Sequence, residues 1–304
     1  MPINLANSPL TKLYLGNTEI LKAYLGTIQV FSNSTPLLDT YPSTAAFSLR
    51  KLRTAYNGNA VRVRRSSDNA EQNIAFNVNG GLDTTALNTF CTGANGFVTT
   101  WYDQQGSNNA TQTVQARQPK IYDSVTGVVL ENGKHAVSFT KTSSQFLNIS
   151  TGFALPIFIS SVVKANIASN DIGGYFGQGT NRVAFGASKV AFNPLNSFWA
   201  WTPNQSCTYG LLNSLDTNQH LHTYYIPDAT ETNWKWYFDG VDTGSAGLTS
   251  GVPTTTSSSA FIGYTGIATE YWNGTIQEII LYNTDQSSNR TGIETNINTY
   301  YIIY

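Results

Sequence analysis

Carboxylates, histidines and paired aromatic side chains are the residues of this sequence that could do chemistry or bind a ligand. Carboxylate oxygens suit Ca²⁺, but no acidic residue here falls into a loop of alternating carboxylates. The acidic candidates are Asp68, Glu71, Asp103, Asp239 and Asp242. His220 and His222 lie two positions apart, without a third ligand at a spacing typical of zinc. We therefore expect no metal and no other cofactor, and we find neither a Ser-His-Asp order nor a phosphate-binding loop.

Two pairs of tryptophans could form a platform for a sugar ring. Trp199 and Trp201 are two residues apart, so on a strand their side chains share one face. The same holds for Trp234 and Trp236, which lead into an Asp-Gly turn and are expected in the core. Trp199 and Trp201 precede a loop that contains Pro203, where exposure is easier. They are therefore the first choice for a glycan contact.

A basic segment at 50–65 allows two interpretations. Its arginines and lysine could bind an anionic glycan or an acidic partner. Alternatively, Val61 and Val63 point inward from a strand, and Arg62 and Arg64 form its outer face. Asp68 and Glu71 are close enough to pair with these arginines, which favours the structural interpretation. The basic residues are Arg50, Lys51, Arg53, Arg62, Arg64 and Arg65.

The composition limits the classes of partner. The chain has 304 residues, a net charge of -1 and only 12 % charged residues, so it has no global attraction for nucleic acid or anionic membranes. Its polar surface must instead consist of Asn, Thr, Ser and Gln, which suit solvated sheet faces and turns. Cys91 and Cys207 exclude a disulfide framework; we favour two buried thiols, with one bridge as the alternative. Neither a leader peptide nor a membrane span is recognised.

The apolar patterns predict three helices among many short strands. Ala45, Leu49 and Leu52 have helical spacing, Asp83 is a good N-cap for a second helix, and a third starts near Ser287. Elsewhere, short alternating runs are separated by Gly, Asn and Asp, which is typical of an all-β sandwich or barrel. These runs are 61–64, 157–159, 183–185, 222–225, 236–238 and 276–279.

A tandem repeat with a ten-residue period occupies 12–31. Each unit carries Lys, Tyr, Leu and Gly at matching positions and predicts a strand, a Gly turn and a second strand. Two such units cannot bury a core alone. We expect residues 1–35 to form an arm for attachment or oligomerisation, favouring a homotrimer; the alternative is an edge of the main domain. The candidate assembly residues are Tyr14, Leu15, Tyr24, Leu25 and Phe31.

Five short blocks are scattered over the chain after residue 40: AAFS at 45–48, RSSD at 65–68, TFC at 89–91, YDQQG at 102–106 and GTIQE at 274–278. They resemble the catalytic domain of the fungal-type α-L-arabinofuranosidase B family. The tail, at 236–240, 261–263 and 272–282, is similar to concanavalin A-like (laminin-G-like) jelly rolls. The resemblance implies an all-β sandwich with a few short helices at 36–304, preceded by the arm.

The resemblance also implies two catalytic carboxyls about 5 Å apart, as in retaining glycosidases. The family's nucleophile is a Glu on the strand after a Gly-rich segment, but this chain has no acidic residue between Asp171 and Asp216. The family's acid is an Asp just after an Ile-Gly pair; here Thr265 follows the pair at 262–263, and Glu270 is the nearest carboxylate. The family's vicinal cysteine pair is missing as well. From the sequence we therefore expect a site without its catalytic residues.

The leading hypothesis is a non-enzymatic structural protein of a phage virion, such as a head or tail fibre, a decoration protein or an adhesion module. Such a protein is made in the host cytoplasm, is exposed on the particle, contacts other virion proteins through the arm, and binds neither nucleic acid nor membrane. Weak binding of a host glycan is expected at Trp199, Trp201, Tyr264 and Trp272.

The alternative hypothesis is an active glycoside hydrolase or depolymerase with relocated carboxylates. Asp171, Glu270 and Glu278 are its candidates, and Glu278 is the weakest because the strand pattern already explains it. Two carboxyls that face each other in a cleft are what this hypothesis requires.

Overall fold

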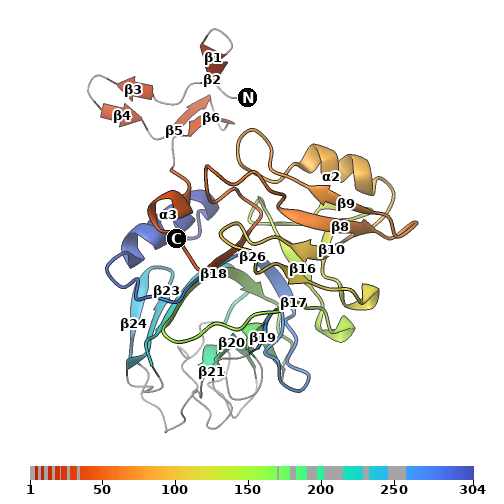
Figure 1. Ribbon diagram of the computed structural model, residues 1–304, viewed down its shortest axis with the longest axis vertical. Helices are drawn as coiled ribbons and strands as arrows, with labels where there is room; N and C mark the ends of the chain where they lie inside the picture. Colours follow the sequence, from red (N-terminus) through yellow and green to blue (C-terminus); the bar gives the residue numbers. More distant parts are fainter. Residues whose placement is uncertain are drawn as a thin grey trace.

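The computed structural model describes residues 35–169, 171–178, 183–189, 197–201, 215–228, 233–245 and 258–304, and the backbone of six short strands before residue 33. Within these residues, eighteen strands join through antiparallel ladders into one continuous sheet that folds over its own core (Figure 1). Three α-helices and two single turns of 3₁₀ helix accompany it. The described part of the chain is therefore mostly β, as the sequence predicts.

One layer of the sheet is built around β26 (Gly274–Tyr282), which pairs with three strands. Its partners are β7 (Ala45–Ser48), β16 (Val137–Phe139) and β18 (Ile157–Ala165). The layer continues from β18 through β22 (Gln219–Ile226), β23 (Lys235–Phe238) and β24 (Val241–Ser245). This layer thus brings together segments from both ends of the described chain.

A second layer is centred on β25 (Ala260–Ile262). It comprises β11 (Ala110–Thr111), β17 (Leu147–Ile149), β19 (Ile172–Gly177), β20 (Ala184–Ser188) and β21 (Ser197–Trp201). Both layers contribute buried side chains to the same core, including Trp236 and Trp272. The sheets therefore pack face to face, and the core position expected for Trp234 and Trp236 is confirmed.

The remaining strands form the part of the sheet shown at the upper right of Figure 1. They are β8 (Val61–Arg65), β9 (Glu71–Ile74), β10 (Gly96–Trp101), β12 (Lys120–Asp123) and β13 (Gly127–Val128), with a separate hairpin of β14 (Leu130–Glu131) and β15 (Lys134–His135). In β8, Val61 and Val63 are buried, as their alternation predicts.

The helices match the sequence predictions in two cases of three. Helix α2 (Thr84–Cys91) starts after Asp83, whose side chain accepts a hydrogen bond from the amide of Ala86, so the predicted cap is confirmed. Helix α3 (Arg290–Tyr301) buries Ile293, Ile297 and Tyr301 against the outer face of β18, β22 and β26. The short segments are α1 (Leu37–Thr40), η1 (Gln115–Arg117) and η2 (Lys141–Ser143).

The helix predicted from Ala45 is wrong, because 45–48 is strand β7. All four residues of β7 are buried. Ala45 and Phe47 face the main core, whereas Ala46 faces the cluster beneath α3. A strand that is buried on both faces has a continuous run of apolar residues. Over a few residues, such a run can contain the spacing expected of a helix.

The repeat at 12–31 forms the two predicted hairpins: β3 (Leu13–Leu15) with β4 (Thr18–Ile20), and β5 (Lys22–Leu25) with β6 (Ile28–Ser32). A third, shorter pair joins β1 (Asn4–Leu5) to β2 (Ser8–Pro9). Leu15 is exposed. The side chains of the other candidate assembly residues, Tyr14, Tyr24, Leu25 and Phe31, lie outside the described part of the structure.

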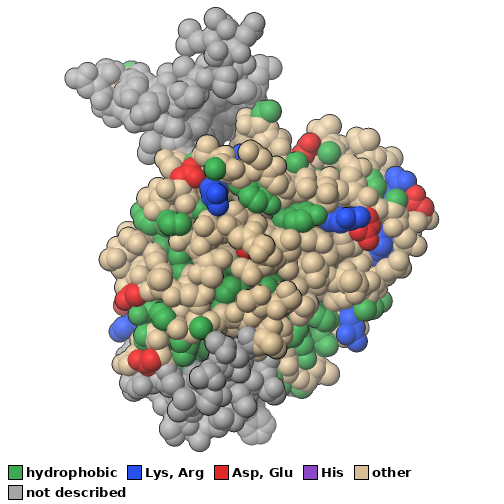
Figure 2. All heavy atoms as spheres, viewed as in Figure 1, with side chains coloured by type: hydrophobic (Ala, Val, Ile, Leu, Met, Phe, Trp, Pro, Cys, Tyr) green, Lys and Arg blue, Asp and Glu red, His purple; other side chains and the backbone are tan. Residues whose placement is uncertain are grey.

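Charged side chains are few and scattered over the face shown in Figure 2. This follows from the low content of charged residues. Among the described residues, no helix combines the length and apolar character that a membrane crossing requires.

Candidate functional site

The segment between β25 and β26 folds back on itself as a hairpin, which we call the acid hairpin (263–272). Tyr264 and Tyr271 pair across it, and the amide of Trp272 donates to the carbonyl of Gly263 at 2.9 Å. One step nearer the tip, the amide of Thr265 donates to the carbonyl of Glu270 at 3.4 Å. Because side chains alternate between the faces of a hairpin, Thr265 and Glu270 share one face.

Glycines in β19 allow the acid hairpin to lie directly on that strand. A Cβ atom at Gly174 would collide with the methyl group of Thr265, and one at Gly177 would collide with its carbonyl oxygen. The amide of Gly174 donates to the carbonyl of Glu270 at 3.2 Å, and Thr265 is fully buried. The Gly-rich run therefore fixes where Glu270 lies.

Glu270 is a partly buried carboxyl group with a raised pKa. Burial raises its pKa, while a hydrogen bond from Thr265 and the positive charge of Lys141 oppose that effect in part. Its Oε2 atom is buried without a hydrogen-bond partner among the described residues. A partly buried carboxyl with a raised pKa is suited to donate a proton near neutral pH.

A second carboxylate, Asp171, pairs with Lys141. The ammonium of Lys141 forms a short ion pair with Oδ1 of Asp171, and this oxygen also accepts from the amide of Ile172 at 2.8 Å. The Asp171 side chain is 31 % exposed, so solvent and ligands can reach it. Lys141 thus pairs with Asp171 and also lowers the pKa of Glu270 against the larger effect of burial.

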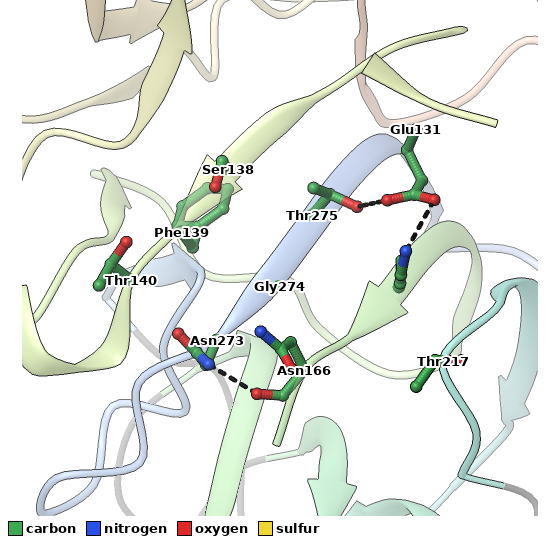
Figure 3. A pocket seen from close by; sticks show the side chains of 10 residues that line it. Glu131, Ser138, Phe139, Thr140, Asn166, Thr217, Asn273, Gly274 and Thr275 are labelled. Atoms are coloured by element: carbon green, nitrogen blue, oxygen red, sulfur yellow. Dashed lines mark hydrogen bonds and ion pairs between the residues drawn. The ribbon is translucent and has the colours of Figure 1, made fainter. Parts of the chain in front are cut away.

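A polar pocket of about 420 Å³ is lined by residues of β16, β18 and β26 and by Asn273 (Figure 3). Hydroxyl and amide groups line most of it, and at one end Glu131 pairs with Lys164 at 3.1 Å. Asn273 donates to the carbonyl of Asn166 at 2.6 Å, and it accepts a long hydrogen bond, 3.4 Å, from the amide of Lys141. Asn273 therefore links the pocket to the backbone of Lys141.

Glu278, the third carboxylate singled out from the sequence, is a structural residue. It is fully buried and accepts hydrogen bonds from Arg50, Ser48 and Tyr301. A carboxylate closed off in this way cannot reach a substrate.

The basic segment does not form an exposed positive patch. Arg62 pairs with Glu71 at 2.6 Å, as expected. Asp68 pairs at 2.6 Å with Arg65 rather than with Arg62 or Arg64. The expectation that Arg64 points outward is wrong. Its side chain is buried because its guanidinium reaches Gln118 and covers a neighbouring aromatic ring. The structural interpretation of the segment is thus the correct one.

The candidate glycan contacts lie in different environments. Trp272 is fully buried in the core, so its placement on a glycan-binding surface is corrected. Tyr264 is partly exposed and stacks on Tyr271, with ring centroids 4.4 Å apart. The side chains of Trp199 and Trp201 lie outside the described part of the structure. Sequence reasoning missed Tyr271, because only the hairpin pairing places it beside Tyr264.

The described residues contain no group of three His, Cys, Asp or Glu side chains that could hold a metal ion. Cys91 is a free, buried thiol, and burial raises its pKa to about 11. Cys207 lies outside the described residues.

Residues 38–167 match the family model described as "Alpha-L-arabinofuranosidase B, catalytic". This part, less than half of the chain, is similar to the arabinofuranosidase B catalytic family. By sequence, no curated protein matches the chain. The carboxylates Asp171 and Glu270 lie beyond the matched segment, so their roles must be argued from the geometry.

Solved arabinofuranosidases share the fold. A GH54 α-L-arabinofuranosidase soaked with a cyclic sulfate inhibitor superposes with a TM-score of 0.68 at 17 % sequence identity, over 87 % of this chain and 65 % of that one. An arabinofuranosidase in complex with arabinofuranosyl-alpha-1,2-xylobiose gives 0.63 at 17 % identity, over 87 % and 64 %. This chain therefore spans just under two thirds of the length of these arabinofuranosidases.

These likenesses overturn the leading sequence hypothesis. The expectation of a non-enzymatic virion protein assumed that the site has no carboxylates, because none stands at the expected places along the chain. The family match and the shared fold instead point to a glycoside hydrolase. The alternative hypothesis, a hydrolase with relocated carboxylates, is the better supported one.

Proposed function

We propose that this chain is a glycoside hydrolase that acts on α-L-arabinofuranosides, with Glu270 as its proton donor. One observation carries the assignment. Thr265 occupies the place where the sequence resemblance expects the acid, and the acid hairpin returns Glu270 to the same face as Thr265. The carboxyl group that is missing along the sequence is thus supplied across the hairpin.

We further propose Asp171 as the second catalytic carboxyl. We also propose that the fold is of the concanavalin A-like (laminin-G-like) jelly-roll type. Glu270 gives its proton to the glycosidic oxygen as the bond to the anomeric carbon breaks, while Asp171 attacks that carbon and forms a glycosyl ester. Glu270, now deprotonated, then takes a proton from the water that cleaves the ester. The ion pair with Lys141 holds the Asp171 side chain in place.

The test compares leaving groups. Glu270→Gln should slow hydrolysis of arabinofuranosyl oligosaccharides by about 10²- to 10⁴-fold, because the alkoxide leaving group needs the proton. It should slow cleavage of 4-nitrophenyl α-L-arabinofuranoside much less, since nitrophenolate leaves without help. Asp171→Asn should slow both reactions. The matched control is Glu294→Gln, because Glu294 also has a pKa raised by burial but lies on α3.

The proposal fails if the wild-type chain cleaves neither substrate, or if Glu270→Gln behaves like the Glu294→Gln control. Proton NMR of the first product tests the role of Asp171 separately. Retention of the anomeric configuration supports a nucleophile, whereas inversion would remove Asp171 from that role.

We infer that residues 1–35 act as an arm for attachment or oligomerisation, separate from the hydrolase at 36–304. The paired strands β3–β4 and β5–β6 support this division, because two isolated hairpins bury too little surface to be stable without a partner. A homotrimer is the proposed form. Attachment to other virion proteins, and a location on a virion, remain predictions from the sequence.

A further inference from the structure

Four aromatic rings gather on the outer face of the second sheet layer. Phe146, Phe261, Tyr264 and Tyr271 are each partly exposed, and we call them the aromatic patch. The ring of Phe146 lies 5.8 Å from Phe261, 5.6 Å from Tyr264 and 6.1 Å from Tyr271, measured between centroids. The two tyrosines stack at 4.4 Å with an angle of 14° between their planes. The four rings thus form one continuous surface.

Three separate segments build the aromatic patch, so its position is fixed by the fold. Phe261 is the outward residue of β25, between the buried Ala260 and Ile262. The tyrosines come from the acid hairpin, where they share the face opposite Thr265 and Glu270. The patch is therefore separated from the Glu270 carboxyl by the thickness of the hairpin.

Polar groups continue the surface beyond the rings. Phe261 pairs with Asn148 in β17, and Asn148 pairs with Thr111 in β11; both side chains are partly exposed. The exposed guanidinium of Arg117 lies over Phe146, 5.9 Å from the ring centroid. Amide, hydroxyl and guanidinium groups thus lie at the edge of an aromatic surface.

This combination suits a sugar chain better than a protein partner. Flat rings stack on the C–H faces of sugar rings, while phenol, amide and guanidinium groups hydrogen-bond to the hydroxyls around them. The neighbours of the patch along β17 and β11 are Asn148 and Thr111 rather than the aliphatic side chains that fill the centre of a protein interface. Asn148 and Thr111 carry no charge. The guanidinium of Arg117 lies over the ring of Phe146 and can donate hydrogen bonds to sugar hydroxyls, so the patch needs no ionic ligand.

We propose that the aromatic patch binds a neutral polysaccharide chain, at a site distinct from the hydrolytic carboxyls. The patch would keep the enzyme on a polymer while Glu270 and Asp171 act on its branches. This binding goes beyond the proposed hydrolysis and does not depend on it, so the two can be tested apart.

The experiment is affinity electrophoresis of the full chain through native gels that contain arabinan, arabinoxylan or polygalacturonate. Tyr271→Leu and Phe261→Leu keep apolar volume but remove a flat ring, and each should weaken binding to arabinan or arabinoxylan by about tenfold. The matched control is Phe76→Leu, because Phe76 is a partly buried ring that packs on Tyr56 outside the patch. This variant should bind like the wild type.

Cleavage of 4-nitrophenyl α-L-arabinofuranoside by Phe261→Leu separates the two proposals, because Phe261 lies in β25, outside the acid hairpin that carries Glu270. Unchanged cleavage with weakened retention in Phe261→Leu supports a distinct binding surface, and retention of the Glu270→Gln variant shows that binding needs no turnover. Three outcomes would overturn the inference: no retention of the wild type by either neutral polymer, retention by polygalacturonate alone, or equal retention of patch and control variants.

Discussion

Arg50 and Glu278 form a two-point ion pair in the interior of the protein. Nε and Nη2 of Arg50 each lie 2.8 Å from one carboxylate oxygen of Glu278, and the two side chains are 8 % and 1 % exposed. Burial by itself would lower the pKa of Arg50, but the facing carboxylate more than offsets this, so the pKa is raised. The pair ties the chain after β7 to the middle of β26.

Removing either partner of this pair should destabilise the fold severely, because the other charge stays buried without compensation. We expect Glu278→Gln or Arg50→Met to lower the free energy of unfolding by about 3–5 kcal/mol. The matched control is Arg62→Met, which breaks the exposed pair with Glu71 and should cost about 0–1 kcal/mol. Chemical denaturation measures both values. Equal losses in the two variants would contradict the structural role of Glu278.

The pH dependence of hydrolysis should report the proton on Glu270. Lys141 lowers the pKa of Glu270 against the larger effect of burial, so Lys141→Met should raise this pKa further. Because the protonated acid is the active form, the alkaline limb of the rate profile should then move to higher pH. Lys120→Met, which breaks a surface pair with Asp123, is the control and should leave the profile in place. If the alkaline limb of the pH–rate profile does not move in Lys141→Met, Glu270 is excluded as the proton donor.

Gly177 sets the position of the acid hairpin, and a methyl group there should disturb catalysis more than stability. In Gly177→Ala, the new Cβ atom would force the backbone of Thr265 away from β19 and carry Glu270 with it. We expect kcat to fall by about 10²-fold, since misplacement by about 1 Å has that effect. Gly81→Ala is the control, because its Cβ would meet only Asn77 at an ordinary contact distance. A kcat that does not change in Gly177→Ala would show that the hairpin tolerates movement.

His220 should give the protein a pH-dependent stability near neutrality. Burial opposes its charge, but hydrogen bonds with Asp239 at 2.7 Å and Asp216 at 2.9 Å more than compensate, so its pKa is raised above 6.5. Its contribution is therefore complete below the unfolded pKa of about 6.5 and disappears as pH rises through the higher folded value. His220→Gln should lose this dependence. Parallel stability curves for wild type and variant above pH 6.5 would show that the imidazolium has no such role.

The sequence predicts most of the fold because its local signals agree with the final packing. Strand β8 alternates, Asp83 caps α2, and the repeat encodes two hairpins. The failure at β7 has a physical cause. Its residues are buried on both faces by strands and helices from distant parts of the chain. The local periodicity of the sequence cannot indicate such burial.

The candidate site was harder to predict because it depends on pairing across a hairpin. In the sequence, Thr265 stands where the resemblance expects an acid, and Glu270 comes five residues after it. The hydrogen bond from Thr265 to the Glu270 carbonyl makes them neighbours in space. The Gly-rich run in β19 was the available signal, since glycines without side chains imply that another backbone approaches closely.

The arm should control assembly rather than folding. Residues from Thr35 onward contain the complete described core, and Thr35 itself is anchored by a hydrogen bond from Asn296 in α3 at 2.9 Å. A version of the chain that starts at Thr35 should therefore fold and cleave 4-nitrophenyl α-L-arabinofuranoside as the full chain does. Light scattering should give the mass of a homotrimer for the full chain and of a monomer for the shortened one. Equal monomeric masses would contradict self-assembly through the arm and leave the repeat as an edge of the main domain or a contact for a different protein.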